Sequence, residues 1–83
     1  MKVLYFAWLR EKAGRAEEQV APPGTVTTVQ ALIDWIRERG GGPADALGDM
    51  AAVRVAVNQE YAMLDHPVKP GDEVAFFPPV TGG

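Results

Sequence analysis

The group in this sequence best suited to covalent chemistry is the carboxylate at the end of its last eight residues, FFPPVTGG. A carboxylate is a poor electrophile until an enzyme converts it to an acyl-adenylate, from which AMP leaves readily. An amine would then give an amide, and sulfide would give a thiocarboxylate. Glycine suits both reactions because no side chain crowds the attacked carbonyl. We therefore expect Gly83, preceded by Gly82, to carry the chemistry, although the residues alone also fit an unused chain end.

The residues before the two glycines are suited to hold them away from the folded body. Pro78 and Pro79 have no amide hydrogen, so neither can continue an interior strand. Proline also favours the extended polyproline II conformation. Val80 to Gly83 would then span about 13–14 Å at ~3.3–3.6 Å per residue. The sequence predicts a flexible, extended functional tail over residues 78–83, in which Pro78, Pro79, Val80 and Thr81 would contact a partner.

Most other catalytic equipment is missing from the composition. The chain of 83 residues has no cysteine, no serine and one histidine. These counts exclude disulfides, thiolate nucleophiles, serine triads and metal sites built from several cysteines or histidines. We therefore expect no metal and no bound cofactor. His66, between Asp65 and Pro67, is interpreted as a turn residue.

Charge and hydropathy limit the partners and the location. The formal net charge is -3 and the lysines and arginines are scattered, which argues against a nucleic-acid partner. No apolar run approaches the ~20 residues that a membrane span needs. The N-terminal segment MKVLYFAWLRE lacks the cleavage site of a signal peptide. A cytoplasmic location is the expectation.

The hydrophobic patterns predict one helix among several strands. The segment TVTTVQALIDWIRERGGG has a capping-box spacing from Thr27 to Gln30 and helical spacing of its apolar residues, and glycines follow it. Leu9–Gly14 and Pro43–Gly48 are predicted to form single turns. The strands are expected at residues 2–8, 17–20, 53–57, 61–64 and 73–77.

One good helix can cover only one face of such a sheet, so the prediction is a two-layer α+β fold in one domain, residues 1–83. The first and last strands are the most apolar and should be central neighbours. The arrangement resembles the β-grasp, or ubiquitin-like, fold, with a mixed sheet and the main helix on one face.

Alternation within the strands predicts an apolar surface on the other face. If Val3 and Val74 face the helix, then Phe6 and Phe77 face away from it, and Tyr61 could join them. Large exposed apolar residues on a small acidic protein usually mark a binding surface. A register error of one residue would exchange the two faces and put these side chains in the core.

Four segments resemble the small subunit of molybdopterin synthase: KVLYFA with the following LRE, AVNQ, DHPV and GDEVAFFPPVTGG. The resemblance implies that an ATP-dependent, E1-like enzyme adenylates Gly83. Sulfur, ultimately from a cysteine desulfurase, would then give 1-thioglycine at Gly83. The tail would enter the large subunit, which holds the catalytic residues, and donate sulfur to precursor Z (cyclic pyranopterin monophosphate) to form the molybdopterin dithiolene.

The same resemblance implies a partner surface and an assembly. Phe6, Tyr61 and Phe77 would dock the large subunit and the activating enzyme, and two small subunits would sit on a central dimer of large ones. The chain would not be an enzyme by itself. Three alternatives remain open: a sulfur carrier for the thiazole of thiamin, a ubiquitin-like modifier of lysines, and a plain interaction module.

Overall fold

The structure, a computed structural model, describes residues 1–79 and contains five strands, three α-helices and one 3-10 helix. In chain order these elements are β1 (Lys2–Tyr5), α1 (Trp8–Ala13), β2 (Glu17–Gln19), α2 (Val29–Arg39), α3 (Gly41–Ala46), η1 (Met50–Ala52), β3 (Arg54–Val57), β4 (Glu60–Ala62) and β5 (Glu73–Phe77).

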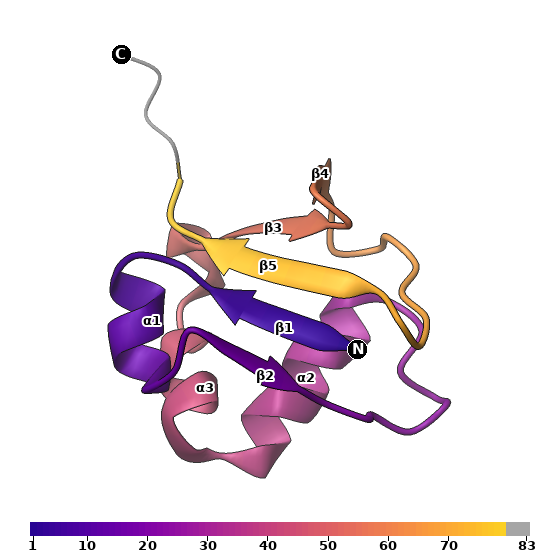
Figure 1. Cartoon of the computed structure of the whole chain (residues 1–83), viewed down its shortest axis with the longest axis horizontal. Helices are drawn as coiled ribbons and strands as arrows, with labels where there is room; N and C mark the ends of the chain where they lie inside the picture. The colour runs from indigo at the N-terminus through magenta and orange to yellow at the C-terminus, as the bar shows by residue number, and fades with distance from the viewer. Residues whose placement is uncertain (80–83) are drawn as a thin grey trace.

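The five strands form one mixed sheet in the order β2-β1-β5-β3-β4 (Figure 1). β1 and β5 run parallel, whereas the other neighbours are antiparallel. The first and last strands are therefore inner neighbours, as their apolar composition predicts. This arrangement places the C-terminal end of β5 in the middle of one sheet end, so the tail begins beside the sheet's most apolar strands.

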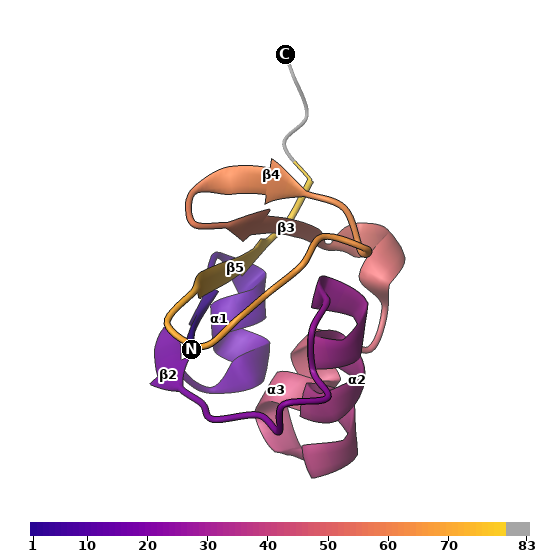
Figure 2. The same cartoon turned by 90° about the vertical axis from the view of Figure 1, so that its right-hand side faces the viewer.

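The helices lie together on one face of the sheet, and no described element covers the other face (Figures 1 and 2). The two-layer α+β prediction is confirmed, although three helices share the covered face where one was expected. None of the helices in residues 1–79 is long and apolar enough to cross a membrane.

The core lies between the sheet and α2, and its side chains follow the predicted alternation. Val3 and Tyr5 of β1 are 0% and 1% exposed, and Val74 and Phe76 of β5 are 0% exposed. The apolar face of α2 is equally buried, at Val29, Leu32, Ile33 and Ile36. The face assignment is therefore correct, and the one-residue slip that would bury Phe6 and Phe77 is excluded.

Several element boundaries differ from the sequence prediction. β4 is Glu60–Ala62, where residues 61–64 were expected, and α3 is Gly41–Ala46, where a turn over Pro43–Gly48 was expected. The first strand ends at Tyr5, before the predicted Trp8, because Ala7 adopts a φ of 55° that an extended strand does not allow. The chain turns there into α1, which ends at Gly14 in the left-handed conformation.

The cap of α2 is Thr28, where Thr27 was predicted. The Thr28 hydroxyl oxygen accepts a hydrogen bond from the Ala31 N–H at 3.1 Å. Thr27 is engaged elsewhere, since its carbonyl oxygen accepts from the Val68 N–H at 2.9 Å. Pairing of this segment with residues 66–68 thus shifts the start of the helix by one residue.

Gly42 lies where two helices pack closely together. From the sequence it was expected only to help end the preceding helix. A Cβ at this position would overlap the Ala13 carbonyl oxygen and lie 2.7 Å from its carbonyl carbon. The helices α1 and α3 therefore approach each other through backbone, which only glycine allows.

We expect Gly42→Ala to lower the free energy of unfolding by about 1–3 kcal/mol, because the backbone of α1 must move to accept the methyl group. Urea titration followed by circular dichroism measures this change. Gly24→Ala is the matched control, since a Cβ there would meet nothing within 4 Å. Equal unfolding midpoints for the two variants would contradict the close approach.

Candidate functional site

The uncovered sheet face carries an apolar surface at the end where β5 finishes. We call this surface the docking face and define it by the outward side chains of Leu4, Phe6, Ala56, Tyr61, Ala75 and Phe77. Phe6 is 49% exposed and Tyr61 is 75% exposed. Strand register aligns four of its members in one row, since Leu4 pairs with Ala75, Ala75 with Ala56, and Ala56 with Tyr61.

The three predicted partner-binding aromatics lie close together on the docking face. The Tyr61 and Phe77 rings meet edge to face, with their centroids 5.6 Å apart and an interplanar angle of 66°. The Phe6 N–H donates to the Phe76 carbonyl at 3.0 Å, which extends the parallel β1–β5 pairing by one residue. Phe6 is thereby held beside Phe77, because both alternate with buried neighbours.

Small residues in the middle of the docking face leave the aromatics prominent. Ala56 and Ala75 lie between Leu4 and Tyr61 in the same row, so nothing larger fills the centre of the surface. The result is a shallow apolar surface flanked by aromatic rings, a shape typical of protein–protein contacts.

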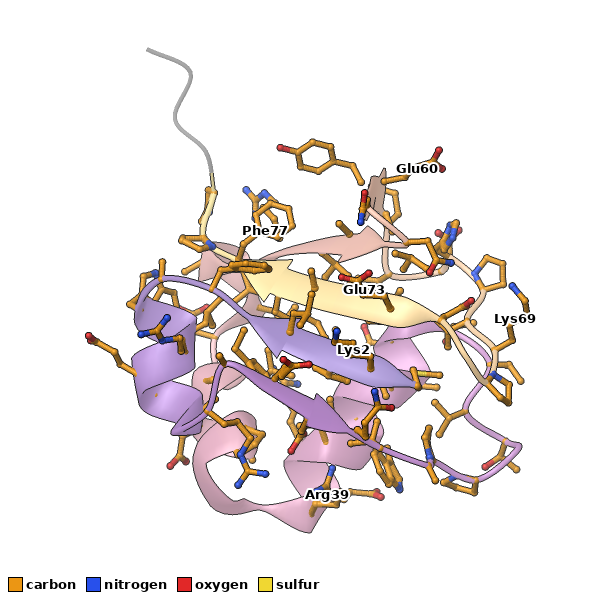
Figure 3. All side chains as sticks on the ribbon, viewed as in Figure 1. Lys2, Arg39, Glu60, Lys69, Glu73 and Phe77 are labelled. Atoms are coloured by element: carbon orange, nitrogen blue, oxygen red, sulfur yellow. The ribbon has the colours of Figure 1, made fainter. Side chains whose placement is uncertain are left out.

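The opposite end of the same face is charged. Lys2 Nζ lies 3.2 Å from Glu17 Oε2, and Lys2 pairs in register with Glu73. Figure 3 shows Lys2 and Glu73 toward one end of the uncovered face and Phe77 toward the other. The apolar side chains thus lie nearer the start of the tail, where a partner holding the tail would touch them. Two charged residues border them, since Arg54 pairs in register with Phe77 and Glu17 with Leu4.

The tail begins where the sequence predicts. β5 ends at Phe77, and Pro78 and Pro79 follow it outside the sheet, Pro78 half-buried and Pro79 exposed. The other four residues assigned to the tail site, Val80, Thr81, Gly82 and Gly83, lie outside the described residues. Their roles therefore stay predictions.

A buried carboxylate, that of Asp72, holds the start of β5 in place. Asp72 is 6% exposed. Its Oδ1 accepts from Asn58 Nδ2 at 3.1 Å and from Lys69 Nζ at 3.2 Å, and its Oδ2 accepts from the Lys69 N–H at 2.9 Å. The hydrogen bond from Asn58, followed by those from Lys69, holds the pKa of Asp72 below its usual range.

Asn58 completes this fastening and shapes the β3–β4 hairpin. Asn58 and Gln59 have φ values of 50° and 70°, the conformation of a two-residue hairpin turn. Asn58 also pairs with Glu73 through its N–H, at 2.7 Å, and its Oδ1, at 3.0 Å. The AVNQ and GDEVAFF segments are therefore in contact through Asn58 and Glu73. The sequence feature that could have indicated this contact is an asparagine at a hairpin-turn position.

We expect Asp72→Asn to lower the free energy of unfolding by about 1–3 kcal/mol at pH 7, through weakened charge-assisted hydrogen bonds. The pKa of Asp72 is lowered by folding, so its contribution is present above the unfolded pKa of about 4 and is lost as the pH falls through the lower folded value. The difference between wild type and variant should accordingly shrink in acid. Urea titrations at several pH values test this, with Asp65→Asn as the exposed control; a difference that stays constant into acid would contradict it.

A second polar network anchors β1 and serves the fold. The Tyr5 hydroxyl donates to Glu18 Oε1 at 3.2 Å, and Arg15 Nη1 donates to Glu18 Oε2 at 2.7 Å. Burial, with the nearby Glu18 charge, raises the pKa of Tyr5. These hydrogen bonds link Tyr5 of β1 to Glu18 of β2 and so hold the two strands together. Each of the groups already has a hydrogen-bond partner, which indicates a structural role.

His66 has the turn role that the sequence predicts. Its N–H donates to the Met63 carbonyl at 3.1 Å, and its carbonyl accepts from the Val29 N–H at 3.0 Å. Among residues 1–79, no group of three or more histidines, aspartates or glutamates could hold a metal ion. Within residues 1–79, the feature best suited to a partner is the exposed apolar sheet face.

Comparisons with known proteins agree with this arrangement. The ThiS family model matches residues 3–83. The molybdopterin synthase sulfur carrier subunit of Escherichia coli K12 is 46% identical over 83 residues, which cover 100% of this chain and 99% of that protein. The structure of SAMP1 from Haloferax volcanii is 32% identical in sequence and has a TM-score of 0.74. The match covers 99% of this chain and 97% of that chain.

A more distant structure shares the fold. A chain in the complex of subunits 1 and 2 of the molybdopterin-converting factor from Helicobacter pylori is 19% identical, with 99% of this chain and 96% of that chain covered and a TM-score of 0.64. Since the family model and the Escherichia coli relative each span almost the whole sequence, this chain belongs to the ThiS family, whose ubiquitin-like β-grasp fold it has.

Proposed function

We propose that this chain is the sulfur carrier subunit of a molybdopterin synthase. One observation carries the proposal: the 46% identity to a protein of that name extends over the full chain, including the tail. The docking face supports it, because a carrier must be held by the proteins that load and unload it, and the apolar surface lies beside the start of the tail.

The chemistry that we propose takes place at the carboxylate of Gly83, which must then be the terminal residue of the active protein. A carboxylate oxygen attacks the α-phosphorus of ATP on an activating enzyme, and pyrophosphate leaves. Hydrosulfide, released from a desulfurase persulfide by a thiol reductant and so derived ultimately from cysteine, then attacks the acyl carbon, and AMP leaves with the bonding electrons. The product is 1-thioglycine at Gly83, a thiocarboxylate.

The folded body delivers this group to the large subunit. Phe6, Tyr61 and Phe77 bind the partner, while Pro78 and Pro79 direct residues 80–83 into its active site. There the thiocarboxylate donates sulfur to precursor Z, and the catalytic residues come from the large subunit. We further propose that two carriers bind a central dimer of large subunits.

A second candidate function is conjugation to lysines, and the similarity to SAMP1 favours it. A solved structure of the Haloferax volcanii protein is described as small archaeal modifier protein 1. Both functions begin with the same adenylate of Gly83 and diverge at the attacking nucleophile, which is sulfide for a carrier and an amine for a modifier. A thiazole sulfur carrier would share the thiocarboxylate and differ only in the acceptor.

Reconstitution tests the proposal. The chain is combined with its large subunit, the activating enzyme, ATP, a sulfide source and precursor Z, and the expected result is molybdopterin formation. A thiocarboxylate that forms but leaves precursor Z unchanged would point to another sulfur acceptor. If a cell extract is added to the same mixture, a ladder of covalent adducts on its proteins without molybdopterin formation would support the modifier.

A further inference from the structure

One edge of the sheet is open and apolar. We propose that the β4 edge, defined as residues 61–64, binds an extended strand of the protein that receives the tail. This inference rests on the proposed function, because it assigns a second contact to the same partner that binds the docking face. In Figure 2, β4 lies at the outer side of the sheet, and it is the last strand in the sheet order.

The direction of the backbone groups shows that the β4 edge is available for pairing. The Asn58 N–H donates to Glu73 of β5, so alternate residues of β3, Ala56 among them, turn their backbone groups toward β5. Val55 and Val57 therefore bond to β4, and their register partners are Ala62 and Glu60.

Tyr61 must then point its backbone N–H and carbonyl away from β3, since these groups alternate along an antiparallel strand. Met63 follows the end of β4 at Ala62, and its carbonyl oxygen accepts from the His66 N–H at 3.1 Å, so only its N–H is offered to a partner. Neither the Tyr61 N–H nor the Met63 N–H has a hydrogen-bond partner among residues 1–79. The Tyr61 carbonyl faces the same way. The β4 edge thus offers the donors and acceptor that an added strand needs.

The side chains along the β4 edge are unusually apolar for an exposed strand. Tyr61, Met63 and Leu64 are 75%, 77% and 43% exposed. A pocket of about 260 Å³ opens beside them, and its lining includes Met50, Val55, Ala62, Met63 and Leu64. In strand addition, main-chain hydrogen bonds supply affinity, and pockets for alternate side chains supply specificity.

The opposite edge of the same sheet is protected in the usual way. β2 has the sequence Glu17-Glu18-Gln19, and Glu17 pairs with Lys2 at 3.2 Å. Charged residues of this kind keep edge strands from pairing with other chains. β4 also begins with an exposed charged residue, Glu60, but residues 61–64 carry no charge, and this stretch is the part of the edge that we propose is covered.

The occupant that we favour is a strand of the partner, because the β4 edge is continuous with the docking face. The Tyr61 ring belongs to that face and meets Phe77, while the Tyr61 backbone belongs to the edge. A second copy of this chain fits less well: two strands of three residues each would bury far less than the ~1,200 Å² of a stable interface. The added strand should carry apolar side chains at alternate positions, one of them entering the pocket.

Amide hydrogen exchange on the isotope-labelled chain tests the proposal, with the purified large subunit of the synthase as the probe. We expect exchange at Tyr61 and Met63 to be fast in the free chain and to slow by about tenfold or more in the complex. The Ala62 amide, already bonded to β3, serves as the internal control. A complex that forms and transfers sulfur while both amides stay fast would overturn this inference and leave the proposed function standing.

Paired variants separate backbone pairing from side-chain contact. Met63→Pro removes the outward N–H and the side chain, whereas Met63→Ala removes the side chain alone. We expect Met63→Pro to bind the large subunit about tenfold more weakly than Met63→Ala; equal affinities of two folded variants would overturn strand addition. If Met63→Pro does not fold, the exchange measurement decides.

Two further outcomes would also overturn the inference. If exchange at Tyr61 and Met63 slows as the concentration of the chain alone is raised, the edge binds a second copy. If no complex with the large subunit forms, both this inference and the proposed function are overturned.

Discussion

Deletion of Gly82 and Gly83 is expected to reduce sulfur transfer to the background rate and to leave the folded body unchanged. The truncated chain would end at Thr81, so its carboxylate would be withdrawn by about 7 Å and crowded by a β-branched side chain. Among residues 1–79 the buried core extends to Phe76, so the deletion removes none of the described core residues. Molybdopterin formation in the reconstituted reaction measures the loss, and thermal unfolding measures the fold.

The control for this deletion is Gly24→Ala, which keeps the chain length and both terminal glycines and adds a Cβ where nothing lies within 4 Å. We expect that variant to retain most of its sulfur transfer. Full activity of the deleted chain, with an unchanged melting curve, would show that the terminal carbonyl of Gly83 is not the loaded group.

Phe77→Ala is expected to weaken binding to the large subunit by about 30-fold or more, the effect of removing a hot-spot residue worth about 2 kcal/mol. Phe77 is half-buried on the uncovered face, where its ring meets the ring of Tyr61 edge to face. The loss of stability should therefore stay well below the ~3–5 kcal/mol that truncation of a buried phenylalanine costs. Titration calorimetry with the large subunit and urea unfolding measure the two effects separately.

Phe76→Ala gives the opposite pattern and is the natural control. Phe76 is adjacent in β5 but is 0% exposed, and its ring stacks with Tyr5 at a centroid distance of 6.0 Å. Its truncation should cost the ~3–5 kcal/mol of a core residue. If Phe77→Ala lost that much stability and kept its affinity, the docking face would be assigned to the wrong side of the sheet.

Alternation was the sequence signal that predicted most of the site. Strands apolar on both faces are central, and the alternation in β1 and β5 predicts which aromatic residues are buried and which are exposed. The apolar residues spaced along α2 indicate that one helix face is buried, and the strand residues that pack against it form the core face of the sheet. Both patterns arise from burial, which acts on many residues together, so they survive local irregularities.

The features that the sequence did not reveal depend on single backbone conformations. Ala7 ends β1 with a positive φ, but alanine carries no signal for such a conformation, so α1 was expected as a short turn only. The helix cap is Thr28 instead of Thr27 for the same kind of reason. Backbone pairing with residues 66–68 keeps this segment extended up to Thr28, so α2 begins only at Val29.

The buried position of Asp72 could not be read locally either. Its partners come from residues 58 and 69, and only the fold brings the first of them near. The residues Lys69-Pro70-Gly71-Asp72 are typical of a turn, but the burial of the Asp72 carboxylate follows from the tertiary structure. The role assigned to residues 80–83 rests on the sequence and on the family.

The intact mass of the chain, measured after incubation with its activating enzyme, ATP and a sulfide source, tests the central claim most directly. We predict a mass increase equal to the difference between sulfur and oxygen, and fragmentation should locate it on Gly83 as the terminal residue. An unchanged mass after complete consumption of ATP, or a mature protein that continues beyond Gly83, would contradict the account.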